Sequence, residues 1–276
     1  MDKAKNKYIL LIISAIAIMI IVADLFIGGI DIEIFAYPLN LILLAIWILG
    51  VASLWSRRKD SSFAKFMLSS YATWLSLGVM VVIGICIGTK AESATTSLGV
   101  ISSILFILTH LSLVVVRGWR NIDGIRWRFI ATHVGLLLAL VAGFWGAPDR
   151  SVQRMALGEG EKSSIAYTMA GGAVSLDYEI ELRELNTARD SRGRLSSIEA
   201  EVMVNNAEAE LSVNKPYTKD LSTRIYIYDI KQGSERELAV IEIISEPWQH
   251  ISVVGILLLM AGAVMMFAKG PKQIKR

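Results

Sequence analysis

The chain is poor in cysteine, histidine and charge: its 276 residues include one cysteine, three histidines and only 19% charged side chains. With Cys86 alone, it has neither an internal disulfide nor the Cys-x-x-Cys and Cys-x-x-Cys-His patterns of thiol oxidoreductases and haem-attachment sites. It also lacks a Gly-x-Ser-x-Gly elbow, a phosphate-binding Gly-rich loop with Lys, and a His-Glu-x-x-His motif. We therefore predict no self-contained catalytic site, and we exclude a thiol oxidoreductase and a c-type cytochrome.

What the chain has in excess is apolar sequence. Hydrophobic residues make up 54% of it and the mean hydropathy is +0.51, whereas soluble domains are about 45–50% apolar. The apolar residues form long uncharged runs, and about 20 such residues cross a hydrocarbon core of about 30 Å. The runs predict a polytopic α-helical membrane protein with about six transmembrane helices, at 8–28, 38–56, 66–88, 98–116, 129–147 and 250–268.

The distribution of Lys and Arg predicts the orientation in the membrane. Basic residues gather before the first run, in 57–65, in 117–128 and after 268, whereas the alternate short loops hold only Lys90. By the positive-inside rule, both termini are cytoplasmic, and an even number of spans agrees with this. Because these basic residues lie at the membrane surface, the net charge of +3 indicates a lipid bilayer and not a nucleic acid as partner.

The segment 148–249, between the fifth and sixth runs, has 18 acidic and 12 basic residues and alternates apolar with polar positions. Such alternation predicts strands, here at 174–182, 198–204, 210–213, 224–228 and 238–244. Asn205-Asn206 is a predicted hairpin turn, since Asn tolerates a positive φ. We predict an extracytoplasmic all-β domain, a small antiparallel sheet or sandwich, inserted before the last helix. The predicted domains are a five-helix transmembrane region at 1–147, the β-rich domain at 148–249, the final helix at 250–268 and a basic cytoplasmic tail at 269–276.

Two of the three histidines lie inside predicted spans. His110 precedes Arg117 at the end of the fourth span by seven residues, and His133 follows Arg128 at the start of the fifth by five. At 1.5 Å per residue, both imidazoles lie about 7–11 Å from the cytoplasmic ends of two neighbouring helices. An ionisable side chain is costly at that depth and indicates function or a polar partner. Either histidine could ligate haem iron, or could hydrogen-bond and pack a neighbouring helix.

The second half of the chain carries four motifs in a fixed order. They are His133-Val134-Gly135-Leu136-Leu137-Leu138, then Leu157-Gly158-Glu159-Gly160-Glu161, then Ser212-Val213-Asn214-Lys215-Pro216 with Arg224-Ile225-Tyr226, and finally Val240-Ile241-Glu242-Ile243 with Glu246-Pro247-Trp248. Together they resemble the ResB/CcsB family of cytochrome c biogenesis proteins over about 130–268. The chain departs from that family in its shorter outer domain, its six rather than four spans, and Glu246 where Asp is usual.

The resemblance implies a membrane subunit of the System II cytochrome c maturation machinery, in the bacterial inner membrane with the β domain in the periplasm. Its implied partners are a CcsA-type membrane protein, apocytochrome c and haem b, which is carried transiently as cargo. The implied axial ligand is His133, with His110 as a candidate second ligand. Since the tryptophan-rich haem-handling segment of CcsA is missing, the chain would be a non-catalytic subunit of a haem lyase (holocytochrome c synthase) complex.

Two other interpretations stay open at this point. In one, the chain is a scaffold that binds no haem and docks apocytochrome or the CcsA-type protein through the β domain. In the other, it is an unrelated transporter subunit, which interrupted spans with internal Pro would favour. All five prolines lie at or outside the ends of the predicted spans.

Overall fold

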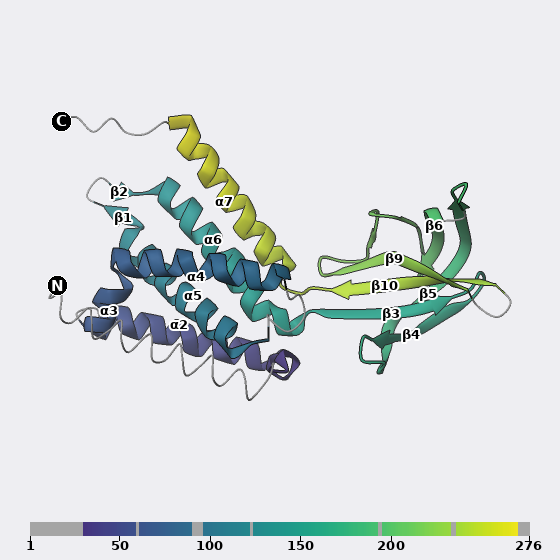
Figure 1. The fold of residues 1–276 in the computed structure, drawn as a ribbon, viewed down its shortest axis with the longest axis horizontal. Coiled ribbons are helices and arrows are strands. Elements are labelled where there is room, and N and C mark those ends of the chain that lie inside the picture. Colours follow the sequence, from purple (N-terminus) through teal and green to yellow (C-terminus); the bar gives the residue numbers. More distant parts are fainter. Residues whose placement is uncertain are drawn as a thin grey trace. The chain divides into compact units, whose positions relative to one another are not determined.

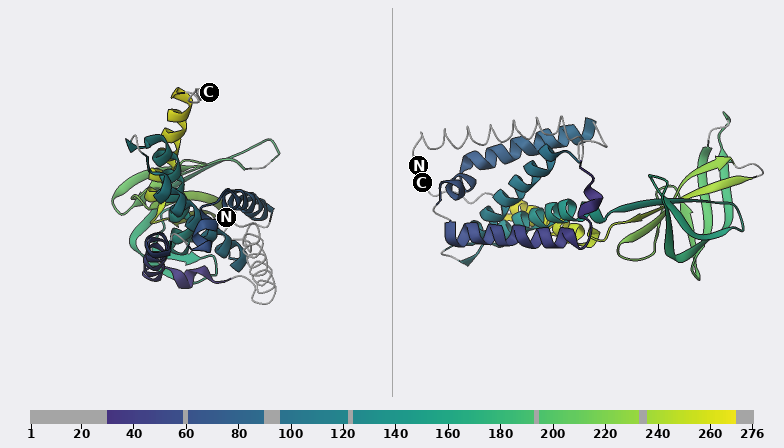
Figure 2. Two further views of the ribbon diagram at one scale, coloured as in Figure 1. Left: turned by 90° about the vertical axis from the view of Figure 1, so that its left-hand side faces the viewer. Right: turned by 90° about the horizontal axis from the view of Figure 1, so that it is seen from below.

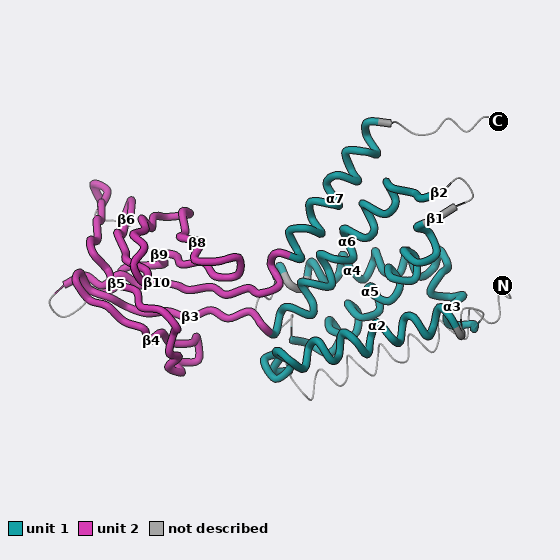
Figure 3. Tube along the Cα trace, turned by 180° about the vertical axis from the view of Figure 1, so that it is seen from behind, with its two compact units in different colours: residues 1–148, 251–276 teal, residues 149–250 magenta. Residues whose placement is uncertain are grey.

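The computed structural model describes residues 30–58, 61–89, 96–121, 124–192, 195–232 and 236–269. The chain forms two compact units, one of residues Met1–Pro148 with Ile251–Arg276 and the other of Asp149–His250 (Figure 3). The predicted first span, 8–28, and nearly all of the predicted basic tail lie outside the described residues.

The first unit is helical. Its described elements are η1 (Ile32–Phe35), α2 (Leu39–Arg58), α3 (Ser62–Met67), α4 (Ser70–Thr89), α5 (Leu98–Gly118), the short strands β1 (Arg120–Asn121) and β2 (Gly124–Ile125), α6 (Trp127–Gly146), η2 (Ala147–Asp149) and α7 (Gln249–Lys269). Within the described ranges, four helices, α2, α5, α6 and α7, are long and apolar enough to cross a membrane, and α4 has a shorter apolar stretch, Ser70–Ile85. A membrane protein with several helical spans is therefore compatible with the structure.

The predicted span 66–88 differs from the helix that forms there, because the chain turns between α3 and α4 and the long helix begins only at Ser70. Ser69 supports this turn: its hydroxyl donates to the carbonyl of Phe66 at 2.6 Å and accepts from the amide of Ala72. A serine hydroxyl that accepts from an amide three residues later is a helix N-cap. Hydropathy alone did not reveal the turn, since Phe66 and Met67 are apolar and buried.

Helices α6 and α7 pack with their backbones in close approach. A Cβ on Gly135 would lie 2.5 Å from the amide nitrogen of Leu259 and 2.7 Å from the carbonyl oxygen of Gly255, and a Cβ on Gly255 would lie 2.6 Å from the amide nitrogen of Ala139. Small residues allow transmembrane helices this proximity and the dispersion contacts that follow from it. Gly135, the glycine of the His-x-Gly motif, therefore allows the backbone of α6 to lie against that of α7.

The second unit is one antiparallel sheet of eight strands (Figure 1). They are β3 (Ser151–Leu157), β4 (Lys162–Thr168), β5 (Ala173–Arg189), β6 (Leu195–Val204), β7 (Ala207–Ser212), β8 (Tyr217–Thr218), β9 (Thr223–Gln232) and β10 (Glu237–Ser245). The spatial order is β7-β6-β5-β4-β3-β10-β9-β8. The first and last strands in the sequence, β3 and β10, therefore pair with each other, and every two consecutive strands pair except β7 and β8. The sheet is curled (Figure 2). Strand β7 comes close to β8 and β9, which makes the sheet an incompletely closed meander barrel and not a sandwich.

The predicted alternation decides which side chains fill the barrel. Along β6, Ile198, Ala200, Val202 and Val204 are buried and the residues between them face outward. They join a single core that includes the fully buried Ile180, Leu182, Leu211, Ile225 and Ile241. All five predicted strands are confirmed, as is the turn at Asn205, whose φ is 52°. Strands β3, β4 and β8 were not predicted.

We expect the substitution Gly135→Ala to destabilise the helical unit, because the new methyl group would meet the backbone of α7. Overpacking costs about 1–3 kcal/mol, which exceeds the gain in helix propensity of about 1 kcal/mol from replacing Gly by Ala. Gly143→Ala on the same helix is the matched control, since no atom lies within 4 Å of its added Cβ. Thermal unfolding in detergent should show a lower midpoint for Gly135→Ala alone; equal midpoints would contradict the close packing.

Candidate functional site

His110 is buried in the first unit and bonded to a neighbouring segment. Its Nδ1 lies 2.6 Å from the carbonyl oxygen of Met67, at the end of α3, and the residue is 6% exposed. Because a carbonyl oxygen only accepts, Nδ1 carries the proton and donates. About two turns further along α5, near its C-terminal end, Arg117 donates to the carbonyl of Leu68 at 2.8 Å. Both side chains therefore tie α5 to the turn between α3 and α4.

The face of α5 that carries His110 packs on α3 and α4. Phe106 and Leu113, four residues before and three after His110, join a cluster with Phe66, Met67 and Ala72. Residues three and four apart share a helix face. Helix α6 meets α5 elsewhere, since a Cβ on Gly118 would touch the ring of Phe129. His110 thus serves the α3–α5 packing as a satisfied core histidine.

His133 lies on α6 and is half-buried. Its Nδ1 is 3.0 Å from the carbonyl oxygen of Phe129 and 2.9 Å from the hydroxyl of Thr132, while its ring stacks on Phe129 at 4.0 Å between centroids. The carbonyl fixes the proton on Nδ1, so that the lone pair is on Nε2, which has no hydrogen-bond partner in the described part of the chain. Fixing one ring nitrogen on a carbonyl is how proteins orient a histidine whose other nitrogen binds metal.

The structure does not bring the two predicted ligands together. No hydrogen bond or ring contact joins the described imidazoles of His110 and His133, and each donates to a different backbone carbonyl. In the described ranges, no group of three or more His, Cys, Asp or Glu side chains could hold a metal ion. The arrangement therefore offers one oriented nitrogen ligand, His133, and no multidentate centre.

A polar and aromatic cluster, which the sequence did not reveal, joins α2, α5 and α6. Asn40 is fully buried and donates to the carbonyl of Trp145 at 3.0 Å, and the indole of Trp47 donates to Thr109 at 3.1 Å. The rings of Trp47 and Trp145 lie 6.5 Å apart. An Asn at the start of an apolar run signals a cap from sequence alone, and its cross-helix partner is visible only in the folded chain.

The Leu157–Glu161 motif forms the turn between β3 and β4. Glu161 accepts from the amide of Gly158 at 2.8 Å, and Gly160 has a φ of 75°, which a type II turn requires at its third position. Arg236 pairs with Glu161 and donates to the carbonyl of Glu159 at 3.0 Å. The motif is therefore a turn at the end of the barrel, stabilised by charge, and does not cradle a phosphate.

The Gly158 amide, followed by the Arg236 guanidinium, lowers the pKa of Glu161 despite the opposing effect of burial. A carboxyl with a lowered folded pKa stabilises the fold above its unfolded pKa, about 4.3, and that stabilisation is lost as pH falls through the folded value. We expect Glu161→Gln to lower resistance to urea at neutral pH, with the difference from wild type shrinking as pH falls below about 4. Circular dichroism of the sheet measures it. Arg236→Gln, which keeps the Gly158 bond, should retain most of the pH effect; a pH-independent difference for Glu161→Gln would contradict it.

We expect His110→Ala to destabilise the helical unit, because the buried carbonyl of Met67 would lose its donor and the ring would leave a cavity. The unpaired carbonyl alone costs about 1–3 kcal/mol. His133→Ala is the matched control, since the Phe129 carbonyl lies within α6 and belongs to the helix ladder. Thermal unfolding in detergent should show the larger loss for His110→Ala, and a larger loss for His133→Ala would contradict these assignments.

In comparisons with known proteins, no family model matches the chain, and no curated protein matches it. The candidate site is therefore argued from its geometry alone: the His133 imidazole of α6 donates from Nδ1 to the Phe129 carbonyl, which leaves Nε2 available. The four ordered motifs of the sequence lie in α6, in the β3–β4 turn, from the end of β7 to β9, and in β10 with the residues just after it.

Proposed function

We propose that the chain is a haem-handling membrane subunit of System II cytochrome c maturation, working with a CcsA-type partner for delivery to apocytochrome c. In this proposal it has about six spans, both termini in the cytoplasm and the β domain in the periplasm, in the bacterial inner membrane. Haem b is cargo and not a resident cofactor. The attachment chemistry belongs to the partner and to the apocytochrome thiols.

One observation carries the proposal: His133 has its Nδ1 on the carbonyl of Phe129 and its Nε2 without a described partner. A neutral imidazole with a free Nε2 is an axial ligand for haem iron. The ring of Phe129, stacked at 4.0 Å, keeps the imidazole plane from rotating. These features fit one axial bond from this chain to the haem iron, so we propose His133 as the ligand and assign His110 to packing. A second axial ligand would come from the partner protein or from another molecule beside the haem.

The role of the chain's own residues is to bind and orient. His133 would hold the iron on the half of α6 near Arg128, the basic end that the positive-inside rule places at the cytoplasm. Helix α6 continues through η2 into β3 without a long linker, so the same segment that carries the histidine enters the β domain. The bound position and the extracytoplasmic domain are thus joined by one short stretch of chain.

We expect the protein, purified with its CcsA-type partner under ample haem, to show a Soret band that His133→Ala weakens and added imidazole restores. Rescue by imidazole separates loss of a ligand from loss of fold. His110→Ala is the control and should keep the ligand signature of the wild type in resonance Raman spectra. A His133→Ala spectrum identical to that of the wild type would refute the proposal.

A scaffold without haem is the second candidate, favoured by the open edge of the β barrel described below. It requires that His133→Ala and His110→Ala both support cytochrome c maturation in cells, while removal of 149–250 abolishes it. The spectrum and the maturation assay together therefore separate the two functions.

A further inference from the structure

The β barrel is open along one line, between β7 and β8. These strands are the two ends of the sheet order, and each pairs with only one other strand. They are held together at one end, where the amide of Ser212 donates to the carbonyl of Lys215 and the amide of Lys215 donates back to Ser212. We call the gap beyond this bridge the barrel seam; it lies between Ala207–Leu211 on one side and Tyr217–Lys219 on the other.

The seam opens because the chain changes its pairing partner at Pro216. Lys215 hydrogen-bonds to β7, whereas Tyr217, two residues later, pairs with Ile225 of β9. In an uninterrupted strand, residues two apart direct their backbone groups to the same side. Pro216 lies between them and has no N–H to give to either neighbour. Beyond the Ser212–Lys215 bridge, β7 and β8 therefore form no ladder.

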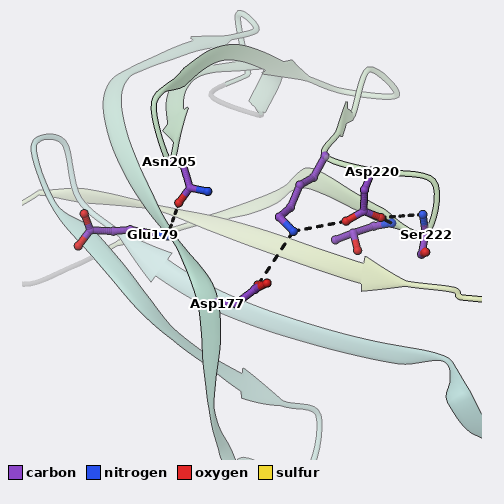
Figure 4. A network of polar contacts seen from close by, with 7 residues as sticks. Asp177, Glu179, Asn205, Asp220 and Ser222 are labelled. Atoms are coloured by element: carbon purple, nitrogen blue, oxygen red, sulfur yellow. Dashed lines mark hydrogen bonds and ion pairs between the residues drawn. The ribbon is translucent and has the colours of Figure 1, made fainter. Parts of the chain in front are cut away.

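A cavity of about 520 Å³ lies in this opening. It is lined by the β6–β7 turn and the start of β7, residues Val204 to Ala207, and across the gap by Tyr217 and Lys219. Figure 4 shows the surrounding polar groups: Asn205 accepts from the amide of Glu179, while Asp177 and Asp220 lie on either side of the Lys219 ammonium, 4.0 and 3.4 Å from it. Lys219 also lies over the ring of Tyr178. The cationic charge in the cavity is thus already neutralised.

Both margins of the seam direct backbone groups into the opening. Since Ser212 directs its N–H and C=O toward Lys215, those of Glu208 and Glu210 face the same side of β7. On β8, Lys219 donates back to Thr223 of β9, so the groups of Thr218 face the seam. An edge with unpaired donors and acceptors is a template for another strand.

The β7 margin of the seam is acidic. Glu184, Glu201 and Glu210 lie directly opposite one another across β5, β6 and β7. Lys215 pairs with Glu210 at 3.0 Å, whereas Glu201 and Glu208 make no ion pair with any residue that the structure describes. The electrostatic field at the seam therefore favours a cationic ligand.

We propose that the barrel seam binds an extended, basic peptide segment, which adds to β7 as a further strand and places its Lys or Arg side chains against the glutamates. Strand addition takes its affinity from main-chain hydrogen bonds and its specificity from alternate side chains. The proposal concerns the second unit alone, and it holds or fails independently of haem binding at His133.

The test uses the full chain in detergent micelles and a fluorescent hexapeptide of alternating Lys and Val, with blocked ends. Fluorescence anisotropy should show saturable binding that weakens with salt, while the peptide of alternating Glu and Val does not bind. N-methylation of every second backbone amide of the basic peptide removes its donors along one edge. Since strand addition needs those donors, the peptide methylated on the pairing edge should bind at least about five-fold more weakly.

The protein variants are Glu208→Lys at the seam and Glu184→Lys as its matched control. Both reverse one glutamate on the outer face, but Glu184 is on β5, two strands away from the seam. We expect Glu208→Lys to weaken binding about five-fold or more and Glu184→Lys to change it little. Circular dichroism confirms that both variants keep the sheet.

Three outcomes would overturn the proposal. The first is no saturable binding of the basic peptide by the wild-type chain. The second is equal binding of the N-methylated and unmodified peptides, which would make the interaction electrostatic only. The third is equal weakening by Glu208→Lys and Glu184→Lys, which would place the peptide on the acidic outer face and not at the seam.

Discussion

The fold depends on two segments of chain, α6 with β3 and β10 with α7, which contact each other as helices and pair as strands. Helices α6 and α7 approach backbone to backbone at Gly135 and Gly255. The strands that continue them, β3 and β10, pair over seven residues from Ser151↔Ser245 onward, and beside them Trp248 donates to Asp149 at 2.7 Å. Because the first and last strands, β3 and β10, pair with each other, neither of them can be a free edge of the sheet. The free edges must therefore be two strands in the middle of the sequence, β7 and β8. The barrel seam at β7–β8 follows from that closure.

The same helix contact decides where the candidate ligand lies. His133 precedes Gly135 by two residues, roughly 200° around the helix axis, so the face that packs on α7 cannot carry the imidazole. The ring instead stacks on Phe129, which packs against Gly118 of α5. One short motif thus does two jobs on opposite faces: the glycine admits α7, and the histidine faces away from it. His110 belongs to another contact, because its donor is used on the carbonyl of Met67.

Sequence patterns predicted the strands that have a clear apolar–polar alternation and missed those that form only because neighbouring strands pair with them. The long alternation in β5 and β6 marked them as strands, whereas β4 reads Lys-Ser-Ser-Ile-Ala-Tyr-Thr and shows little alternation, and β8 has two residues. Both are strands because they hydrogen-bond to neighbouring strands, β4 to β5 and β8 to β9. The break before α4 was hidden because Phe66 and Met67 are apolar. A depth for the histidines could be predicted from hydropathy, but their hydrogen-bond partners, 43 and 4 residues away, depend on helix rotation and packing.

The acidic row across β5, β6 and β7 does not stabilise the barrel, so its presence needs another explanation. Like charges directly opposite on neighbouring strands destabilise a sheet by roughly 0.2–1 kcal/mol for each pair. Glu201 faces a glutamate on both sides. Two carboxylates elsewhere on the domain have basic partners: Glu242 bonds Arg154 at 2.7 Å and Glu246 bonds Arg150 at 2.7 Å. The row of like charges lies beside β7, one of the two edges of the described sheet with unpaired backbone groups. A cationic strand laid there would relieve the repulsion and extend the ladder.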